Sequence, residues 1–134
     1  MQSKLFVLPS ELSSRPDFEQ FVLYLDRLLT KYADQIAFVV LFGSMARGNW
    51  SRGSDYDLLI GLDKDDGKRL IDRTMEFSAD AERLALDVQP FVYCRSEWEL
   101  MFQEAHPLLL EVLEHGMSLW DRGDYARLKS VFEQ

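Results

Sequence analysis

Two aspartates, Asp55 and Asp57, stand one residue apart at the start of an apolar run in the middle of the chain. Successive side chains of a strand point to opposite faces, so residues two positions apart point the same way. Two carboxylates held that close repel each other unless a proton or a cation lies between them. Oxygen ligands without a neighbouring His or Cys suit Mg²⁺ or Mn²⁺ and argue against Zn²⁺. A turn-capping role would explain one aspartate but not an aligned pair, so the pair predicts a divalent-cation site.

Gly43 and Ser44 end the preceding apolar run and lead into a short polar stretch. Glycine lets the backbone come close to a ligand, and successive N–H groups at the start of a helix form an anion site. The same residues could simply form a tight strand-to-helix turn with Ser44 as the N-cap, and both interpretations can hold together. A phosphate-binding turn beside metal-binding carboxylates predicts a metal–nucleotide site.

Asp87 is the candidate third carboxylate, because it stands between the apolar residues Leu86 and Val88. We expect it inside a strand, where burial without a partner would be costly and a cation shared with the aspartate pair would supply one. The alternative is a solvent-facing residue at a sheet edge that shares its face with Gln89. We interpret Asp87 as a site residue.

These residues resemble a known signature. Gly43-Ser44, then ten residues, then Asp55-x-Asp57 is similar to the motif of the DNA polymerase β-type nucleotidyltransferase superfamily. The fuller form, L-F-G-S-M-A-R-G followed by S-D-Y-D-L-L-I, resembles the minimal (MNT-type) nucleotidyltransferases of bacteria and archaea. Those proteins are often the antitoxin of a pair whose toxin is a HEPN-domain RNase.

The resemblance implies Mg²⁺-dependent transfer of AMP from ATP to a hydroxyl, on a tyrosine of a HEPN toxin partner, by a type VII-like antitoxin. Two Mg²⁺ ions, with Mn²⁺ as a substitute, are expected. The implied catalytic and metal-binding residues are Asp55, Asp57 and Asp87, and the implied nucleotide contacts are Gly43, Ser44 and Arg47. Arg52 is a weaker candidate for a phosphate contact, and Trp50 is expected to pack the loop.

Two other functions are compatible with the same motif. The protein could neutralise its partner by binding alone, with a vestigial site, although the presence of all three acids and the Gly-Ser turn argues against decay. It could instead modify a small molecule, as aminoglycoside nucleotidyltransferases do. The short chain after the third predicted strand leaves little room for the helical domain that holds the drug in those enzymes.

The elements that position these residues follow from hydrophobic periodicity. Ile36 to Phe42 is a continuous apolar run typical of a strand buried on both faces. Pro90 has no N–H to donate to a neighbouring strand, so the third strand should lie at a sheet edge or end its pairing there. Helices are expected at about 16–33, 43–50 and 67–83, then from Ser96, then after Pro107 up to a C-cap at Gly116, and finally at 124–132. Strands are expected at 36–42, 56–62, 86–93 and 117–120. Residues 5–8 are expected to form an apolar arm.

Composition sets the remaining expectations. The chain has 134 residues, 47% hydrophobic, with 15 Lys+Arg against 23 Asp+Glu and a net charge of −8. That balance disfavours nucleic-acid binding, which depends on clustered Lys and Arg. One cysteine, Cys94, excludes an internal disulfide, and no apolar stretch is long enough for a signal peptide or a membrane span, so we expect a cytoplasmic protein. Homo-oligomerisation stays open.

The fold class predicted is α/β (α+β), a nucleotidyltransferase fold. A small mixed sheet of three or four strands should have helices packed on one face and extra C-terminal helices. The whole chain, residues 1–134, is expected to form a single nucleotidyltransferase domain.

Overall fold

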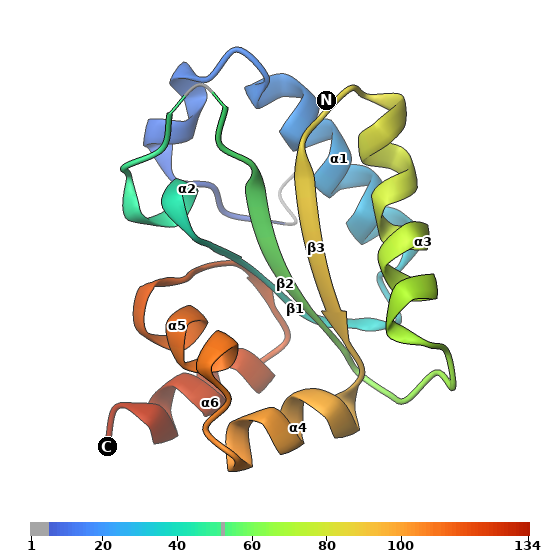
Figure 1. Ribbon diagram of the computed structural model, residues 1–134, viewed down its shortest axis with the longest axis vertical. Helices are drawn as coiled ribbons and strands as arrows, with labels where there is room; N and C mark the ends of the chain where they lie inside the picture. The colour runs from blue at the N-terminus through green and yellow to red at the C-terminus, as the bar shows by residue number, and fades with distance from the viewer. Residues whose placement is uncertain (1–5, 52) are drawn as a thin grey trace.

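The computed structural model describes residues 6–51 and 53–134, which build one mixed sheet between two layers of helices (Figure 1). The strands are β1 (Ile36–Phe42), β2 (Tyr56–Leu62), β3 (Val88–Tyr93) and β4 (Met117–Asp121). The helices are the 3₁₀-helix η1 (Ser10–Ser14), α1 (Phe18–Lys31), α2 (Ser44–Arg47), α3 (Leu70–Arg83), α4 (Arg95–Gln103), α5 (Pro107–His115) and α6 (Asp124–Phe132).

The strand order is β3-β2-β1-β4. β1 is antiparallel to both β2 and β4, whereas β2 and β3 are parallel. The predicted mixed sheet is therefore confirmed. Because of these directions, β1 ends at the edge of the sheet where β2 and β3 begin. The Gly-Ser turn and the start of the two acid-bearing strands consequently meet at one end of the molecule.

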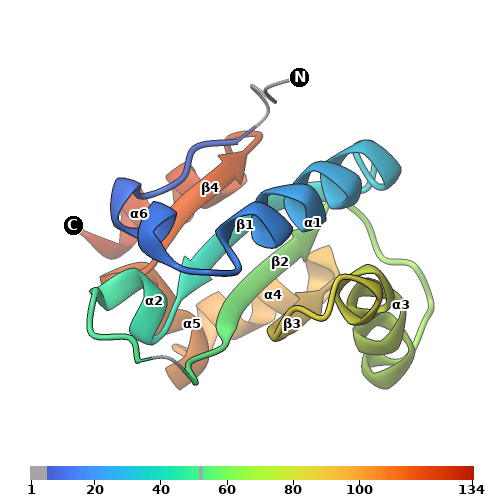
Figure 2. The ribbon, with the colours of Figure 1, turned by 90° about the horizontal axis from the view of Figure 1, so that it is seen from above.

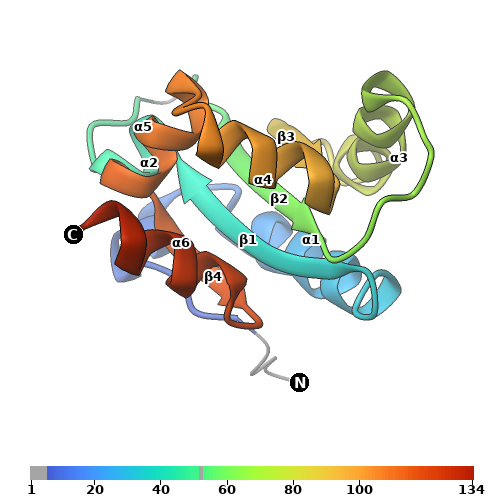
Figure 3. The ribbon, with the colours of Figure 1, turned by 90° about the horizontal axis from the view of Figure 1, so that it is seen from below.

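Both faces of the sheet are covered. Helices α1 and α3 pack on one face (Figure 2), and α4, α5 and α6 pack on the other (Figure 3). Every residue of β1 is buried, because this central strand has a helical layer on each side. The extra C-terminal helices thus provide the second layer. No helix in the described part of the chain is long and apolar enough to cross a lipid bilayer.

The element boundaries agree closely with the apolar pattern in the sheet and less well elsewhere. β1 and β2 occupy the predicted residues, while α1 is two residues shorter at each end than expected. The 3₁₀-helix was not predicted, and α4 has Cys94, not Ser96, as its N-cap, with the Cys94 N–H donating to Glu97 at 2.9 Å. Helix ends depend on local capping contacts, which the period of the apolar residues does not encode.

β3 lies at the edge of the sheet, as Pro90 indicated. The Tyr56 N–H donates to the Asp87 carbonyl at 2.9 Å. From Asp87 onward, alternate residues therefore direct their backbone N–H and C=O groups toward β2, and the residues between them direct these groups away from it. The backbone nitrogen of Pro90 points away from β2, so its missing N–H removes no hydrogen bond between the strands. At the other edge, Val7 donates its N–H to the Leu119 carbonyl of β4 at 2.8 Å. The N-terminal arm therefore packs on the body, although Leu5 lies outside the described residues.

Arg73 ties together three elements at the end of the sheet remote from the Gly-Ser turn. Its guanidinium, on a side chain only 2% exposed, donates to Asp66 at 3.1 Å and to Glu97 at 2.8 Å. It also donates to the carbonyls of Val92 at 3.0 Å and Lys68 at 2.8 Å. Because these partners belong to the loop before α3, to β3 and to α4, one side chain closes this end of the fold.

Replacing Arg73 by methionine should destabilise the protein without unfolding it. Breaking a fully buried ion pair costs about 3–5 kcal/mol, but Asp66 and Glu97 are partly exposed and can regain water, so we expect a loss of about 2–3 kcal/mol. Urea unfolding of the two proteins measures the difference. Arg69→Met, which removes an exposed ion pair with Asp72, is the control and should change the free energy of unfolding by less than about 1 kcal/mol. Equal effects of the two substitutions would contradict this assignment.

Candidate active site

The alternation of β2 places Asp55 and Asp57 on the face covered by the C-terminal helices. Tyr56 and Leu58 point into the core beneath α1, whereas Leu59 points into the core with α4 and α5. The two aspartates share the parity of Leu59 and therefore project to that second face. Both are partly exposed, because α4 and α6 cover the opposite end of the sheet (Figure 1).

Asp87 lies beside this pair and on the same face. Tyr56 is in register with Val88, so the residues preceding them, Asp55 and Asp87, are neighbours across the two parallel strands. Val88 points into the first core, which directs Asp87 to the second face. The next residue of that face, Gln89, is in register with Asp57. The three sequence-predicted acids thus start adjacent strands and project to one side of the sheet.

The expectation that Asp87 is buried inside a strand is wrong. β3 begins only at Val88, and Asp87 and Gln89 are both exposed. The cost of burying a charge therefore says nothing about Asp87. The two side chains project to the second face where it is open, whereas Val88 and Pro90, which point to the other face of the same strand, are buried. Among the residues described, no three His, Cys, Asp or Glu side chains are arranged so that they could hold one metal ion.

Gly43 is the residue that lets Asp57 sit against the turn. Its φ of 74° and ψ of −156° belong to a region that essentially only glycine adopts. A Cβ placed on Gly43 would lie 2.4 Å from the Asp57 Oδ2 atom. Phe42, the residue before the turn, is in register with Asp57. Ser44 is the first residue of α2, and the N-cap is Gly43 rather than Ser44 as one interpretation expected.

The electrostatics of the pair favour a positive ligand. Burial raises the pKa of Asp57 above its ordinary value, and the charge of Asp55 raises it further. Both causes disfavour the ionised carboxylate in the absence of a counter-charge. Oxygen donors alone fit a hard divalent cation such as Mg²⁺. Asp55 and Asp57 therefore fit a divalent cation directly.

The predicted nucleotide contact Arg47 forms an ion pair with Glu111 of α5. Both side chains are substantially exposed, so this is a surface contact that a phosphate could compete with. Arg52, the weaker candidate, lies outside the described residues. Trp50 packs as expected: the guanidinium of Arg15 lies over its ring at 4.9 Å from the centroid.

Arg15 is the residue near the site that sequence reasoning missed. It is 6% exposed and donates to the carbonyls of Ser51 and Ser54, at 3.2 and 3.4 Å, just before the aspartate pair. It also donates to the Tyr56 hydroxyl at 3.0 Å and to Asp17 at 3.1 Å. Partners up to 41 positions away leave no local pattern, so the sequence held no signal for this contact.

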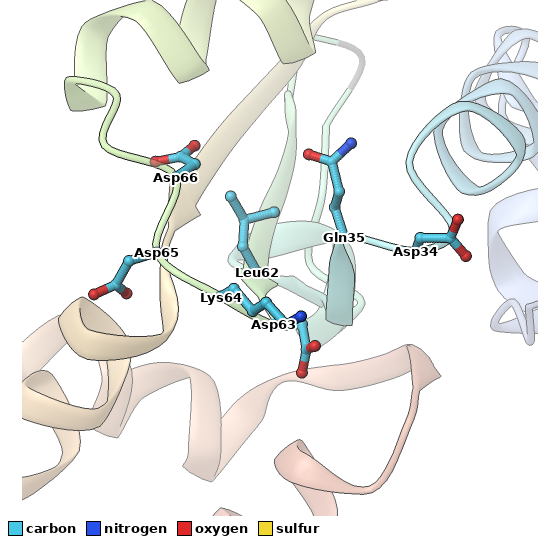
Figure 4. Close-up of a pocket in the computed structure, with 7 residues that line it drawn as sticks. All are labelled: Asp34, Gln35, Leu62, Asp63, Lys64, Asp65 and Asp66. Atoms are coloured by element: carbon cyan, nitrogen blue, oxygen red, sulfur yellow. The ribbon is translucent and has the colours of Figure 1, made fainter.

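A hollow of about 300 Å³ lies at the far end of β2, away from the candidate site (Figure 4). Three of the four aspartates that line it are engaged in structural contacts. Asp63 accepts from Arg95 at 3.0 Å, Asp65 from the Ser96 N–H at 2.9 Å, and Asp66 from Arg73 at 3.1 Å. The figure shows their carboxylates spread around the rim instead of converging. This hollow is a structural junction of loops.

The family of the chain follows from its sequence and agrees with this geometry. The model of the polymerase beta nucleotidyltransferase family matches residues 25–124, a span that contains the Gly-Ser turn and the three acids. The chain belongs to this family and is a nucleotidyltransferase. A Methanocaldococcus jannaschii protein named as a candidate protein adenylyltransferase is 28% identical over 109 residues, which cover 76% of this chain and 70% of that protein.

Solved structures share the fold. A toxin–antitoxin complex with AMP-PNP contains a chain that superimposes with a TM-score of 0.55 at 21% identity, covering 83% of this chain and 82% of the other. A mutant of the toxin–antitoxin MntA-HpeT gives a TM-score of 0.54 at 21% identity, covering 81% and 80%. At this identity the likeness establishes the nucleotidyltransferase fold, confirming the predicted fold class.

Substituting Gly43 by alanine should disrupt the site more than the fold. The new methyl group would collide with the Asp57 carboxylate, and the positive φ would strain the backbone by about 1–3 kcal/mol. We expect a lower melting temperature together with loss of Mg²⁺-dependent AMP-PNP binding, measured by calorimetry. Gly48→Ala is the matched control, because Gly48 also has a positive φ but has free space around it. Equal loss of AMP-PNP binding in both variants would contradict the role assigned to Gly43.

Replacing Asp57 by asparagine should stabilise the metal-free protein at neutral pH. The folded state raises the pKa of Asp57 above 3.8, so its ionisation opposes folding at higher pH, and this penalty disappears below the unfolded pKa. The gain in melting temperature should therefore be present at pH 7 and absent below about pH 3.8. Added Mg²⁺ should raise the melting temperature of the wild type but not of the variant. Asp34→Asn, at an exposed aspartate elsewhere, should show neither effect.

Proposed function

We propose that this protein is a protein adenylyltransferase that transfers AMP from ATP to a tyrosine hydroxyl of a HEPN-domain toxin and thereby acts as its antitoxin. The observation that carries the proposal is the Asp55–Asp57 pair, held against the Gly43 turn with Asp87 beside it on an open part of the sheet. Family membership supports nucleotidyl transfer. The name of the archaeal relative and the toxin–antitoxin complexes among the structural neighbours support a protein acceptor and a toxin partner.

Asp55, Asp57 and Asp87 would hold two Mg²⁺ ions, or Mn²⁺ in their place, with the partly exposed pair Asp55 and Asp57 as the principal ligands. Bound Mg²⁺ would supply positive charge that neutralises the triphosphate and the leaving pyrophosphate. The AMP-PNP in the structural neighbour supports ATP as the nucleotide. Rotation of the exposed Asp87 side chain toward its neighbours would complete the carboxylate set once their charges are compensated.

The residues of the turn would bind the nucleotide. The backbone at Gly43 and Ser44, and the Ser44 hydroxyl, would contact the β- and γ-phosphates. Arg47 would add positive charge after exchanging Glu111 for a phosphate. These contacts would fix the α-phosphorus relative to the carboxylates, so that the acceptor hydroxyl can approach it in line with the leaving group.

The transfer would then be a single displacement. The tyrosine oxygen forms a bond to the α-phosphorus, the bond from that phosphorus to the bridging oxygen of the β-phosphate breaks, and pyrophosphate leaves. The hydroxyl proton passes to the carboxylate of Asp87, whose exposure on the edge strand makes it accessible to a protein acceptor. The modified tyrosine carries AMP through a phosphodiester bond.

Activity can be tested by co-expressing the chain with a HEPN-domain protein from the same genome and measuring the intact mass of that partner. We expect a gain of one AMP unit, or a short run of them, with the wild type. Asp57→Asn should lose at least about 10²-fold of the transfer, since charge stabilisation of this kind supplies several kcal/mol of transition-state energy. Asp34→Asn should transfer normally.

The other outcomes separate the alternatives. A tight complex with an unmodified partner would show neutralisation by binding alone and would overturn the enzymatic proposal. AMP transfer to an added aminoglycoside, with no modified protein, would favour the small-molecule enzyme. Against that alternative, the residues after β3 form helices whose apolar side chains fill the second core instead of a separate drug-binding domain.

A further inference from the structure

The buried guanidinium of Arg15 lies beneath the stretch of chain that enters β2. Arg15 takes no direct part in the proposed chemistry, because it lies on the α1 side of the sheet and the aspartates face the other side. Its ion-pair partner Asp17 immediately precedes α1. Removing a guanidinium charge from water costs free energy unless fixed partners compensate it. The partners of Arg15 therefore indicate what this residue does.

The planar fork of an arginine can bind several oxygens at once, and Arg15 does so. Nη1 and Nη2 donate to the carbonyls of Ser51 and Ser54, while Nε donates to the Tyr56 hydroxyl. That hydroxyl donates in turn to Asp17 at 2.6 Å. The guanidinium also lies over the rings of Trp50 and Tyr56, at 4.9 and 5.1 Å from their centroids. We name this set of residues, Arg15, Asp17, Trp50 and Tyr56, the Arg15 latch.

The Arg15 latch fixes the backbone on both sides of the first catalytic aspartate. Ser54 directly precedes Asp55, and Tyr56 stands between Asp55 and Asp57. The Tyr56 ring is stacked on Phe21 at 3.9 Å between centroids, and its hydroxyl is held at the far end, so its orientation is fully determined. Because alternate strand residues project to opposite faces, a fixed Tyr56 fixes the direction of its two acidic neighbours.

We propose that Arg15 is a positioning residue of the nucleotidyltransferase site, which acts through Ser54 and Tyr56 to hold Asp55 and Asp57 against the Gly43 turn. The inference rests on the proposed function, because it assigns the aspartates to that reaction. Catalytic groups misplaced by about 1 Å can lose about 10²-fold in rate, so an anchor on the opposite face of the sheet can control chemistry it never touches. The Arg15 latch thus links the packing of α1 to the geometry of the site.

Arg15→Met tests the proposal against Arg73→Met, a matched control. Arg15 and Arg73 are the two buried charged residues of the described chain, and each binds two carbonyls and at least one carboxylate. Only Arg15 is next to the site. At a temperature where both variants are folded, we expect Arg15→Met to lower the kcat of AMP transfer to the HEPN-domain partner by about ten- to a hundredfold. Arg73→Met, with a comparable drop in melting temperature, should keep its kcat within about twofold of wild type.

Two milder variants guard against a simple loss of folding. Tyr56→Phe keeps the stack on Phe21 but removes the hydroxyl that joins Arg15 to Asp17, and should give an intermediate loss of kcat. Arg15→Lys keeps the charge, but its single ammonium nitrogen cannot reach both carbonyls and Asp17 together. Compared with Arg15→Met, this variant should therefore recover more of the stability than of the kcat. In both variants the affinity for AMP-PNP with Mg²⁺, measured by calorimetry, should fall, because the aspartates no longer hold the cation in place.

The outcomes distinguish this inference from the proposed function. If Arg15→Met and Arg73→Met lose kcat in proportion to their stability, or if Arg15→Met keeps full kcat, the positioning role is wrong. If the wild type binds AMP-PNP with Mg²⁺ but transfers no AMP, the proposed reaction fails while calorimetry still tests the Arg15 latch: weaker binding in Arg15→Met alone supports it, and equal binding in both variants overturns it.

Discussion

The close approach of the Asp57 carboxylate to a glycine without a Cβ is the constraint on which the site depends. A second carboxylate, Asp55, projects to the same face, and its charge adds to burial in raising the pKa of Asp57. The turn at Gly43 adopts a backbone conformation that other residues avoid, and the missing Cβ leaves room for the Asp57 carboxylate.

The rest of the fold maintains this arrangement from a distance. The antiparallel pairing of β1 with β2 brings the end of one strand to the start of the other, and the parallel pairing of β2 with β3 adds Asp87. Helices on both faces make β1 a fully buried strand, which fixes the position of the turn at its end. Two buried arginines then close the two ends of the sheet, Arg73 at the loop before α3 and Arg15 at the entry to β2.

In the proposed reaction, the open half of the second face would be the side from which the acceptor approaches. The C-terminal helices cover the sheet near the end of β2 (Figure 1). Asp87, just before the edge strand, and Gln89 within it are exposed. A macromolecular acceptor can reach an edge strand more easily than an enclosed cleft. Pro90 in the same strand limits pairing with another chain at that edge, so an acceptor would be held by side chains and not by a continued sheet.

The sequence by itself determined the strands β1 and β2, the edge position of β3 and the residues of the turn and the aspartate pair. These depend on local patterns: an unbroken apolar run, alternation, a proline, and acids two residues apart. The exposure of Asp87, the covering of the second face by the C-terminal helices, and the Arg15 latch were decided by the tertiary structure. Each of these depends on contacts between residues tens of positions apart. The spacing of apolar residues along the sequence does not indicate which distant residues come into contact.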